Sequence, residues 1–333
     1  MTSIETDVLI IGAGPIGIEL AVALKRAGVL HVQLDAGQIG STIHWYAPQT
    51  HFFSSPERIA ISGVPLQTLD QTKATREEYL TYLRTVVLQF DLEIQTYERV
   101  TSLIHRPDGL FDVTSRRQDG ERRWLARSVI VAIGDMHRPH LLDIPGEDLP
   151  HVSHYYKEPY QHATRNVVVV GAKNSSAKAA LQLTRAGAKV TLLVRGPAIS
   201  DSVKYWIRPD LVNRIAEGRI TAHFNTTITA ITPAAVEVLT PEGPLRIPTD
   251  FVYALTGYHP DEALLGRLGV DPDPADEARA PLFDPATHET TRPGVFVAGT
   301  VCGGRATSRW FIENGRHHAQ LIAAYLAGGV FVG

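Results

Sequence analysis

Two stretches of the chain repeat the same order of apolar and polar positions. The first begins with the apolar run Val8–Ile11, continues through a glycine-rich turn and an Ala/Leu-rich segment, and ends at Gly28. The second begins with Val167–Val170 and follows the same order to Gly187. An unbroken β-branched run is typical of a parallel strand buried on both faces, and the segment after it has the period of a covering helix. Each copy therefore predicts a strand–helix–strand unit.

Each half closes with a further apolar strand that ends in glycine. These strands are Val129–Gly134 and Phe251–Gly257, and a last strand, Gly294–Thr300, precedes a final helix from about Trp310 to Leu326. The order predicts an α/β protein with two Rossmann-like dinucleotide-binding domains, the second inserted into the first. We expect a discontinuous first domain of residues 1–136 and 258–333 and a second domain of residues 137–257.

The composition narrows the classes of function. Lys and Arg total 32 and Asp and Glu total 35, so a net charge of −3 argues against a nucleic-acid partner. The N-terminus has no basic segment and no long apolar run, which predicts a cytoplasmic protein without a membrane anchor. Cys302 is the single cysteine of 333 residues, so the chain has no internal disulfide and no CxxC pair. Redox chemistry would have to be carried by a cofactor.

The first turn has the glycine spacing of a dinucleotide-binding loop. Gly12, Gly14 and Gly17 follow a predicted strand and open a predicted helix, where a pyrophosphate can approach the backbone. Asp35 ends the next strand, in the position from which an acid accepts hydrogen bonds from ribose hydroxyls. The pattern predicts a nucleotide site of the FAD type.

The second turn differs in chemistry. It carries Lys173 and Ser176 where glycines are usual, and Arg195 stands in the position that Asp35 has in the first copy. A guanidinium suits a 2′-phosphate, which favours NADP over NAD. Lys204 adds a second candidate cation. One acidic and one basic site predict a flavoprotein that binds FAD in the first domain and receives a hydride from NADPH in the second.

The chain resembles the FAD- and NADPH-dependent flavoproteins of the thioredoxin reductase type, and among them the bacillithiol-disulfide reductase (YpdA-type) group. The segments that carry the resemblance are Gln49–Ser55, Ile144–Pro150, Gly171–Ser176, Thr256–Asp261 and Phe311–Arg316. The resemblance implies a thioredoxin reductase-like fold, a homodimer, and a low-molecular-weight disulfide such as bacillithiol disulfide as the electron acceptor.

The resemblance and the loop positions together predict two sets of cofactor-binding residues. The FAD set is Gly12, Gly14, Pro15, Ile16, Asp35, Trp45, His51, Phe52, Val100 (through its backbone), Gly134, Gly299, Thr300 and Ile312. The NADPH set is Gly171, Lys173, Asn174, Ser175, Ser176, Arg195 and Lys204.

Three features depart from the family pattern. The CxxC of the thioredoxin reductases is missing, Ile16 occupies the position of the cysteine usual in the bacillithiol-disulfide reductases, and Thr300 replaces an acid that bonds the ribityl chain. Cys302 is the only thiol that can stand in, and no other catalytic group is assigned. The histidines show no metal-ligand spacing with cysteines or carboxylates, so no metal site is expected.

Other functions fit parts of the pattern. A ferredoxin- or flavodoxin-NADP reductase needs no redox cysteine pair, and its partner would be a redox carrier protein. A flavin monooxygenase shares the two nucleotide sites. A non-catalytic redox sensor would keep the FAD site and Asp35 but would have no use for Arg195.

Overall fold

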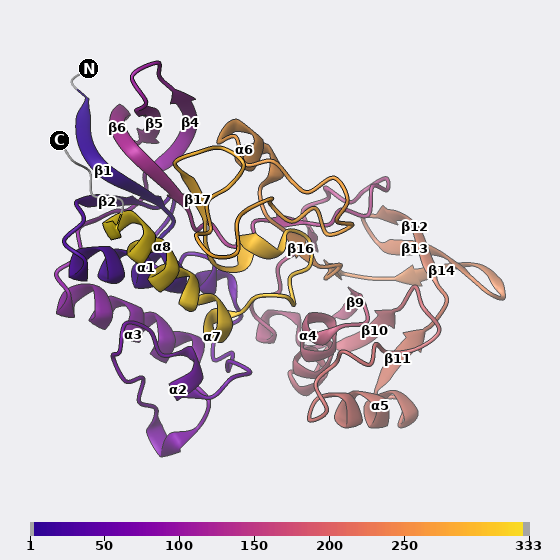
Figure 1. Ribbon diagram of the computed structural model, residues 1–333. Helices are drawn as coiled ribbons and strands as arrows, with labels where there is room; N and C mark the ends of the chain where they lie inside the picture. Colours follow the sequence, from indigo (N-terminus) through magenta and orange to yellow (C-terminus); the bar gives the residue numbers. More distant parts are fainter. Residues whose placement is uncertain (1–2, 329–333) are drawn as a thin grey trace. The chain divides into compact units, whose positions relative to one another are not determined.

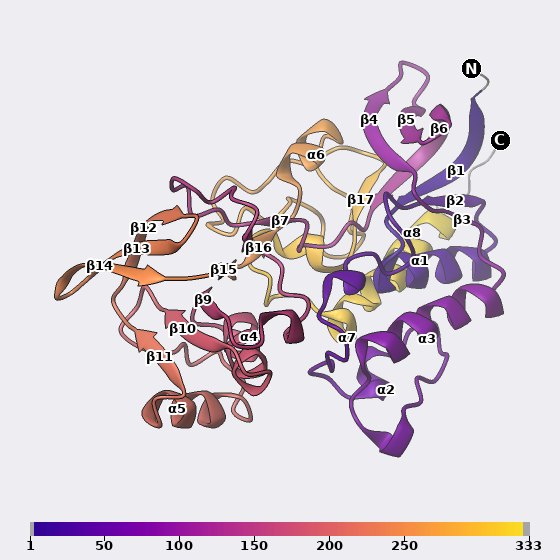
Figure 2. The same cartoon turned by 180° about the vertical axis from the view of Figure 1, so that it is seen from behind.

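The computed structural model describes residues 3–328, and the chain divides into two compact units. The first contains the chain up to His44, Gln49–Arg138 and the part from Tyr258 onward, and the second contains Trp45–Pro48 and Pro139–Gly257. Most of the second unit is one continuous segment, Pro139–Gly257, that lies between two parts of the first unit along the chain (Figures 1 and 2). The second unit's main segment, Pro139–Gly257, begins two residues after the expected start and ends at the expected residue. The expected division did not include Trp45–Pro48, which group with the second unit.

The first unit is built on a seven-stranded sheet in the order β3-β2-β1-β6-β5-β4, with β17 beside β6. The strands are β1 (Ile4–Ile11), β2 (His31–Leu34), β3 (Ile94–Gln95), β4 (Arg99–His105), β5 (Phe111–Arg117), β6 (Gly120–Val131) and β17 (Val295–Val297). The strands β3, β2, β1, β6 and β17 run parallel, whereas β4, β5 and β6 form an antiparallel meander. The carboxyl ends of the parallel strands therefore meet at one edge, where a dinucleotide binds in such sheets.

Both faces of this sheet are buried, as the unbroken apolar runs predicted. Val8 and Ile10 of β1 lie in one core cluster with residues of α1 (Pro15–Arg26) and α8 (His317–Gly328). Leu9 and Ile11 lie in a second cluster on the opposite face. Each of these four side chains is at most 5% exposed, and each contributes about 2 kcal/mol through burial.

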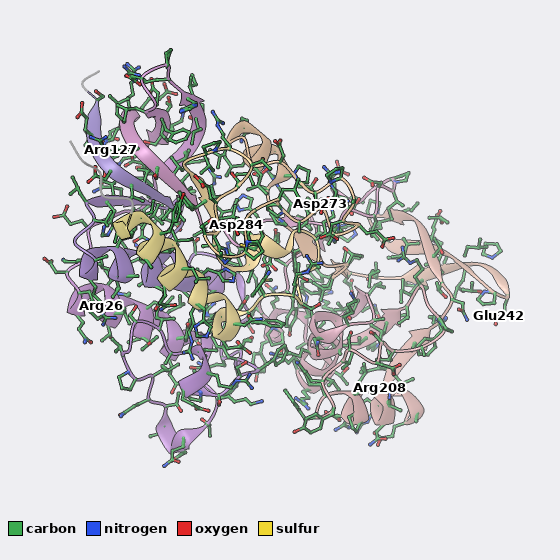
Figure 3. All side chains as sticks on the ribbon, in the orientation of Figure 1. Arg26, Arg127, Arg208, Glu242, Asp273 and Asp284 are labelled. Carbon is green, nitrogen blue, oxygen red and sulfur yellow. The ribbon has the colours of Figure 1, made fainter. Side chains whose placement is uncertain are left out.

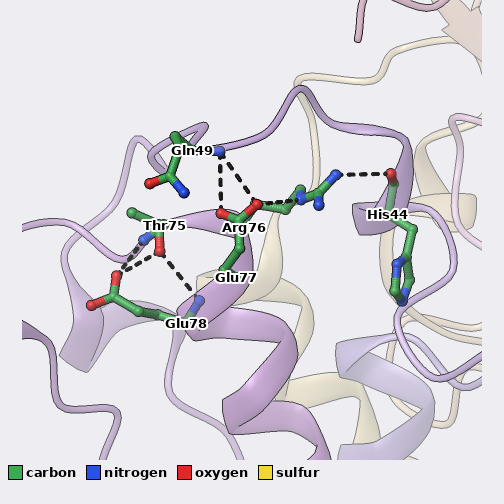
Figure 4. A network of polar contacts seen from close by, with 6 residues as sticks. All are labelled: His44, Gln49, Thr75, Arg76, Glu77 and Glu78. Carbon is green, nitrogen blue, oxygen red and sulfur yellow. Dashed lines mark hydrogen bonds and ion pairs between the residues drawn. The ribbon is translucent and has the colours of Figure 1, made fainter. Parts of the chain in front are cut away.

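The other helices of this unit are short, apart from one. They are α2 (Pro56–Ile59), α3 (Arg76–Gln89), α6 (Glu262–Arg267) and α7 (Ile312–Gly315), with 3-10 turns η2 (Leu69–Gln71) and η4 (Gly299–Gly303). Thr75 and Glu78 form a capping box at the start of α3, which Figure 4 shows. The prediction of a single final helix from about Trp310 to Leu326 is wrong, because the structure has two separate helices, α7 and α8. Between them the Ala319 N–H donates to the Arg316 carbonyl, three residues back, which is a tighter turn than that of an α-helix.

The second unit has a five-stranded parallel sheet in the order β11-β10-β9-β15-β8 and a three-stranded antiparallel sheet. The strands of the first sheet are β8 (Val152–Ser153), β9 (Asn166–Val170), β10 (Lys189–Leu193), β11 (Ile220–His223) and β15 (Phe251–Ala254). The antiparallel sheet contains β12 (Thr227–Thr232), β13 (Ala235–Thr240) and β14 (Gly243–Pro248), and two short strands, β7 (Arg138–Pro139) and β16 (Tyr258–His259), lie where the chain crosses between the units.

The helices of the second unit are α4 (Asn174–Arg185) and α5 (Arg208–Ala216), with a 3-10 turn, η3 (Tyr160–His162). A core cluster joins the two sheets through residues such as Val168, Val236 and Val252. The predicted Rossmann-like order of strand, loop, helix and strand is confirmed in both units. Among the described residues, no helix is long and apolar enough to cross a membrane.

Candidate functional site: two dinucleotide loops of opposite charge

The glycines of the first loop have different tasks. Gly12 has a φ of +117°, and a Cβ there would lie 2.4 Å from the Ala132 carbonyl oxygen. A Cβ at Gly17 would lie 2.1 Å from the Gly12 oxygen, so both positions require glycine for the fold itself. Gly14, the N-cap of α1, has nothing within 4 Å of its Cβ position. This open space beside a helix N-terminus is where a pyrophosphate fits.

Asp35 lies beside this loop at the end of β2. Its carboxylate is 8% exposed and accepts hydrogen bonds from the Ala13 N–H at 2.6 Å, the Gly37 N–H at 2.7 Å and the Ser41 hydroxyl at 3.3 Å. Burial raises the pKa of Asp35, and the backbone bonds oppose that effect. The acid thus fixes the loop and places an acceptor where a ribose would lie, so the residues present fit a flavin dinucleotide.

A second buried acid, which sequence reasoning missed, lies at the same edge of the sheet. Gly134 and Asp135 follow β6, and Thr300 follows the paired strand β17. Asp135 is 7% exposed, and burial raises its pKa to about 6 against the opposing effect of a hydrogen bond with the Thr300 hydroxyl. The departure at Thr300 is therefore accompanied by a carboxyl group on the neighbouring strand. The only sequence signal was the acid directly after Gly134.

Ile16 and Cys302 are both buried in the first unit. Ile16 is 7% exposed and lies against Gly299, whose Cβ position is 3.1 Å from the Ile16 side chain. Cys302 is 1% exposed, and burial raises the pKa of its thiol, which disfavours the thiolate needed for nucleophilic attack. Its Sγ lies 3.9 Å from Nδ1 of His318. The fold thus surrounds the single thiol with protein atoms.

The aromatic segment after His44 is divided between the units. Trp45 belongs to the second unit, where its ring lies edge-on to Tyr155 at 5.1 Å. Phe52 is half-buried in the first unit and packs on Tyr79 with ring centroids 4.6 Å apart. His51 is exposed.

This segment is held by polar contacts to the start of α3 (Figure 4). The Gln49 N–H donates to the Glu77 carboxylate at 3.2 Å, and Arg76 donates to Glu77 at 2.9 Å and to the His44 carbonyl at 3.3 Å. The network fixes the backbone before His51 and Phe52.

The remaining predicted FAD residues lie on four elements. Val100 of β4 is 4% exposed and lies in a core cluster. Ile312 is half-buried at the first position of α7. Pro15 opens α1, and Gly299 opens the η4 turn after β17.

The second loop has the same backbone turn but a different lining. Gly171 has a φ of +131°, and the Ser176 hydroxyl donates to the Lys173 carbonyl at 2.9 Å. The Asn174 amide group donates to the Ser202 carbonyl at 3.1 Å and accepts from the Lys204 N–H at 2.9 Å. These bonds hold the segment around Lys204 against the start of α4.

The cations of the second unit are more exposed than the acids of the first. Arg195 and Lys173 are exposed, Ser175 is exposed, and Lys204 is half-buried. In the described part of the chain, no carboxylate pairs with Arg195. A guanidinium at the carboxyl edge of a parallel sheet is suited to a phosphate ester.

Comparison with known proteins matches this architecture. Residues 9–299 match the family model described as pyridine nucleotide-disulphide oxidoreductase. The chain belongs to this family. Membership implies a flavin and a nicotinamide dinucleotide as cofactors, which agrees with the two loops.

Three relatives extend the comparison. The chain is 36% identical to the bacilliredoxin reductase Bdr of Bacillus subtilis (strain 168), over 97% of this chain and 98% of the relative. It is 35% identical to the bacillithiol disulfide reductase Bdr (YpdA) from Bacillus cereus, with a TM-score of 0.94 over 98% and 99% of the two chains. A thioredoxin reductase from T. acidophilum shares the fold, with 22% identity and a TM-score of 0.73 over 98% of both chains.

Proposed function

We propose that this protein is an NADPH-dependent flavoprotein reductase of a low-molecular-weight disulfide of the bacillithiol class. FAD occupies the first unit and NADPH the second. The relatives named for bacillithiol disulfide and bacilliredoxin, matched over almost their whole length, support the substrate class. In the net reaction NADPH, one proton and one disulfide give NADP⁺ and two thiols.

One observation carries the cofactor assignment: the same loop occurs twice with opposite charges beside it. Asp35 is a buried acceptor that suits ribose hydroxyls, and Arg195 is an exposed donor that suits a 2′-phosphate. Bound FAD would supply the two-electron chemistry that no side chain of this protein offers.

The side chains of each unit have defined tasks in this proposal. Gly14 leaves room for the FAD pyrophosphate, Asp35 accepts from its ribose, and the backbone of Val100 borders its adenine. In the second unit, the backbone N–H groups at the start of α4, including that of Ser175, face the NADPH pyrophosphate, and Arg195 binds the 2′-phosphate. Because the chain has one cysteine, the disulfide is reduced without a protein dithiol.

The direct test is anaerobic reduction of the purified flavoprotein with NADPH, followed by mixing with bacillithiol disulfide. We expect the flavin absorbance to return at a rate that rises with disulfide concentration, with two thiols formed per NADPH consumed. NADH in place of NADPH is the matched control and should reduce the flavin more slowly. Flavin that stays reduced in the presence of the disulfide would refute the proposed substrate.

A second candidate is favoured by the missing thiol. Ile16 stands where the bacillithiol-disulfide reductase group usually has cysteine, and Cys302 is buried. A ferredoxin- or flavodoxin-NADP reductase requires neither thiol. If the reduced flavin reacts with ferredoxin or flavodoxin but not with the disulfide, this candidate replaces the first. The homodimer and the cytoplasmic location stay predictions, and the first is checked by sedimentation.

A further inference from the structure

Three metal-ligating side chains from three separate segments meet in the first unit. His288 precedes β17, Cys302 lies in η4, and His318 lies in the first turn of α8. Their exposed fractions are 3%, 1% and 2%. One ligand atom from each lies within 4.8 Å of the other two. We call these residues the His–Cys–His cluster.

The geometry suits a shared ion. The Cys302 Sγ lies 3.9 Å from His318 Nδ1. The two imidazole centroids are 4.0 Å apart, so the rings have to spread to about 5.5 Å to bind one trigonal ion together. Metal bonds of about 2.3 Å to sulfur and about 2.05 Å to nitrogen, in a trigonal arrangement, separate the two ligand atoms by about 3.8 Å. The distance between sulfur and nitrogen therefore needs almost no change.

The surroundings prepare His288 as a ligand. With its Nδ1–H donated to the Val297 carbonyl at 3.1 Å, His288 has the lone pair of Nε2 available. Histidine ligands of metals usually donate their second nitrogen to a carbonyl or carboxylate in this way.

The polar groups of His318 are incompletely satisfied. Its Nε2 is buried without a hydrogen-bond partner, and so is Nε1 of Trp310, whose ring centroid lies 4.4 Å from that of His318. The Gly299 N–H donates to Nδ1 of His318 at 3.1 Å. An ion bound at Nδ1 displaces this bond, and a neutral N–H···N bond is much weaker than coordination of imidazole to a metal.

We infer that the His–Cys–His cluster is a binding site for one thiophilic metal ion, with a thiolate and two imidazoles as ligands. Charge balance favours Cu⁺ over Zn²⁺. Cu⁺ with one thiolate is neutral, whereas Zn²⁺ leaves one positive charge among buried apolar side chains such as Val301. Asp284, labelled in Figure 3, is the acid closest in sequence before His288, but it is exposed to solvent.

Binding has a defined proton balance and a structural consequence. The Cys302 thiol releases one proton per ion, and both imidazoles bind in their neutral form without releasing any. The ion would join three separate segments of the first unit: the stretch before β17, the η4 turn and the start of α8. It would thereby raise the thermal stability of this unit.

The test is an anaerobic titration of the holoprotein with Cu⁺ buffered by bicinchoninate. We expect one Cu⁺ per chain, one proton released per Cu⁺, and a higher melting temperature. The Cys302→Ser variant keeps the size of the side chain and should lose proton release, with affinity at least about a hundredfold lower. His288→Leu should show the same loss of affinity. Circular dichroism and flavin content check that both variants fold.

Two controls separate the cluster from adventitious binding. His105→Gln removes an exposed histidine of the same unit and should bind Cu⁺ like the wild type. Co²⁺, which reports on a zinc site through bands beyond the absorption of oxidised flavin, should bind more weakly than Cu⁺. Tighter binding of Zn²⁺ or Co²⁺ would overturn the choice of ion. Equal Cu⁺ binding by wild type and Cys302→Ser would overturn the site.

Discussion

The two glycine loops share one backbone path but tolerate different side chains. Gly12 and Gly171 both have a φ above +110°, at the same point after the first strand of each unit. At the third position of the motif, Gly17 leaves no room for a Cβ, whereas the second loop holds Ser176, whose hydroxyl bonds the Lys173 carbonyl. The first helix therefore lies closer to its loop than a serine would allow. The third position of the motif thus requires glycine in the first loop but accepts serine in the second.

The two units also differ in how their charged residues relate to the fold. Asp35 is buried and bonded to the loop that it serves, whereas Arg195 is exposed and serves no such structural role in the described residues. The first arrangement suits a resident cofactor, and the second suits a dinucleotide that leaves after each turnover. Each of the following changes tests one part of this contrast.

The largest expected effect comes from exchanging the third loop residues. Gly17→Ser places a Cβ about 2 Å from a backbone oxygen, so we expect the free energy of unfolding to fall by about 3 kcal/mol or more, with loss of the flavin. Ser176→Gly loses a hydrogen bond and places a glycine in the first turn of α4, where ordering the more flexible backbone is less favourable. We expect the two changes together to lower the free energy of unfolding by about 1–2 kcal/mol. Urea unfolding of both variants gives the comparison, and equal losses would contradict it.

Gly14→Ala is the matched control for the first loop. Its Cβ meets no protein atom, and its backbone φ of −76° is ordinary, so the apoprotein should keep its stability within about 0.5 kcal/mol. The methyl group occupies the space that we assign to the pyrophosphate. We therefore expect FAD affinity, measured by flavin fluorescence, to fall at least about tenfold. Unchanged affinity would place the cofactor elsewhere.

The second effect concerns Asp135. This acid is buried, whereas the candidate cations of the second unit are exposed or half-buried. Its folded pKa of about 6 lies above the ordinary value, so the native state holds the proton more tightly than the unfolded chain. Stability is therefore lost as the pH rises toward and through 6. Between pH 5 and 7.5 the wild-type apoprotein should lose about 1.5 kcal/mol relative to Asp135→Asn.

Urea unfolding of the apoproteins at the two pH values measures this difference. Asp112→Asn is the control, because the Arg123 guanidinium, which donates to the Asp112 carboxylate, lowers the pKa of that group, and arginine does not titrate in this pH window. The contribution of Asp112 is lost only as the pH falls below the ordinary aspartate range. The control should therefore show the wild-type slope between pH 5 and 7.5. If the free energy of unfolding of Asp135→Asn fell between pH 5 and 7.5 as much as that of the wild type, the prediction would be refuted.

The third effect tests the basic side of the contrast. Arg195→Ala should raise the KM for NADPH about thirtyfold, equivalent to about 2 kcal/mol, and leave the KM for NADH almost unchanged. Lys189→Ala, an exposed cation at the opposite end of β10, should change neither. Steady-state kinetics with both nucleotides measures the ratio. An equal loss with NADH would mean that Arg195 does not contact the 2′-phosphate.

The smallest effect is expected at Lys204. Its backbone N–H donates to the Asn174 side chain, and an alanine keeps that bond. We expect Lys204→Ala to raise the KM for NADPH about threefold, because partly exposed charges contribute less than about 1 kcal/mol. The same kinetic measurements apply. An effect as large as that of Arg195→Ala would make Lys204 a second principal phosphate ligand.

The sequence by itself determined the strand–helix–strand order at the start of each unit, the two glycine loops and the opposite charges at Asp35 and Arg195. These features are local: period, turn chemistry and spacing are readable within about thirty residues. The family resemblance and the absence of a protein dithiol also follow from the sequence alone, because segments and cysteines can be compared without knowing the fold.

Only the tertiary structure decided which distant residues meet. His288, Cys302 and His318 show no ligand spacing, yet strand β17 and helix α8 bring them together. Asp135 joins Thr300 because β6 and β17 pair, and Trp45 groups with the second unit although its sequence neighbours lie in the first. Such contacts depend on sheet order and on how the elements pack, over 30 residues in the His–Cys–His cluster and 165 residues between Asp135 and Thr300, and no local pattern encodes them.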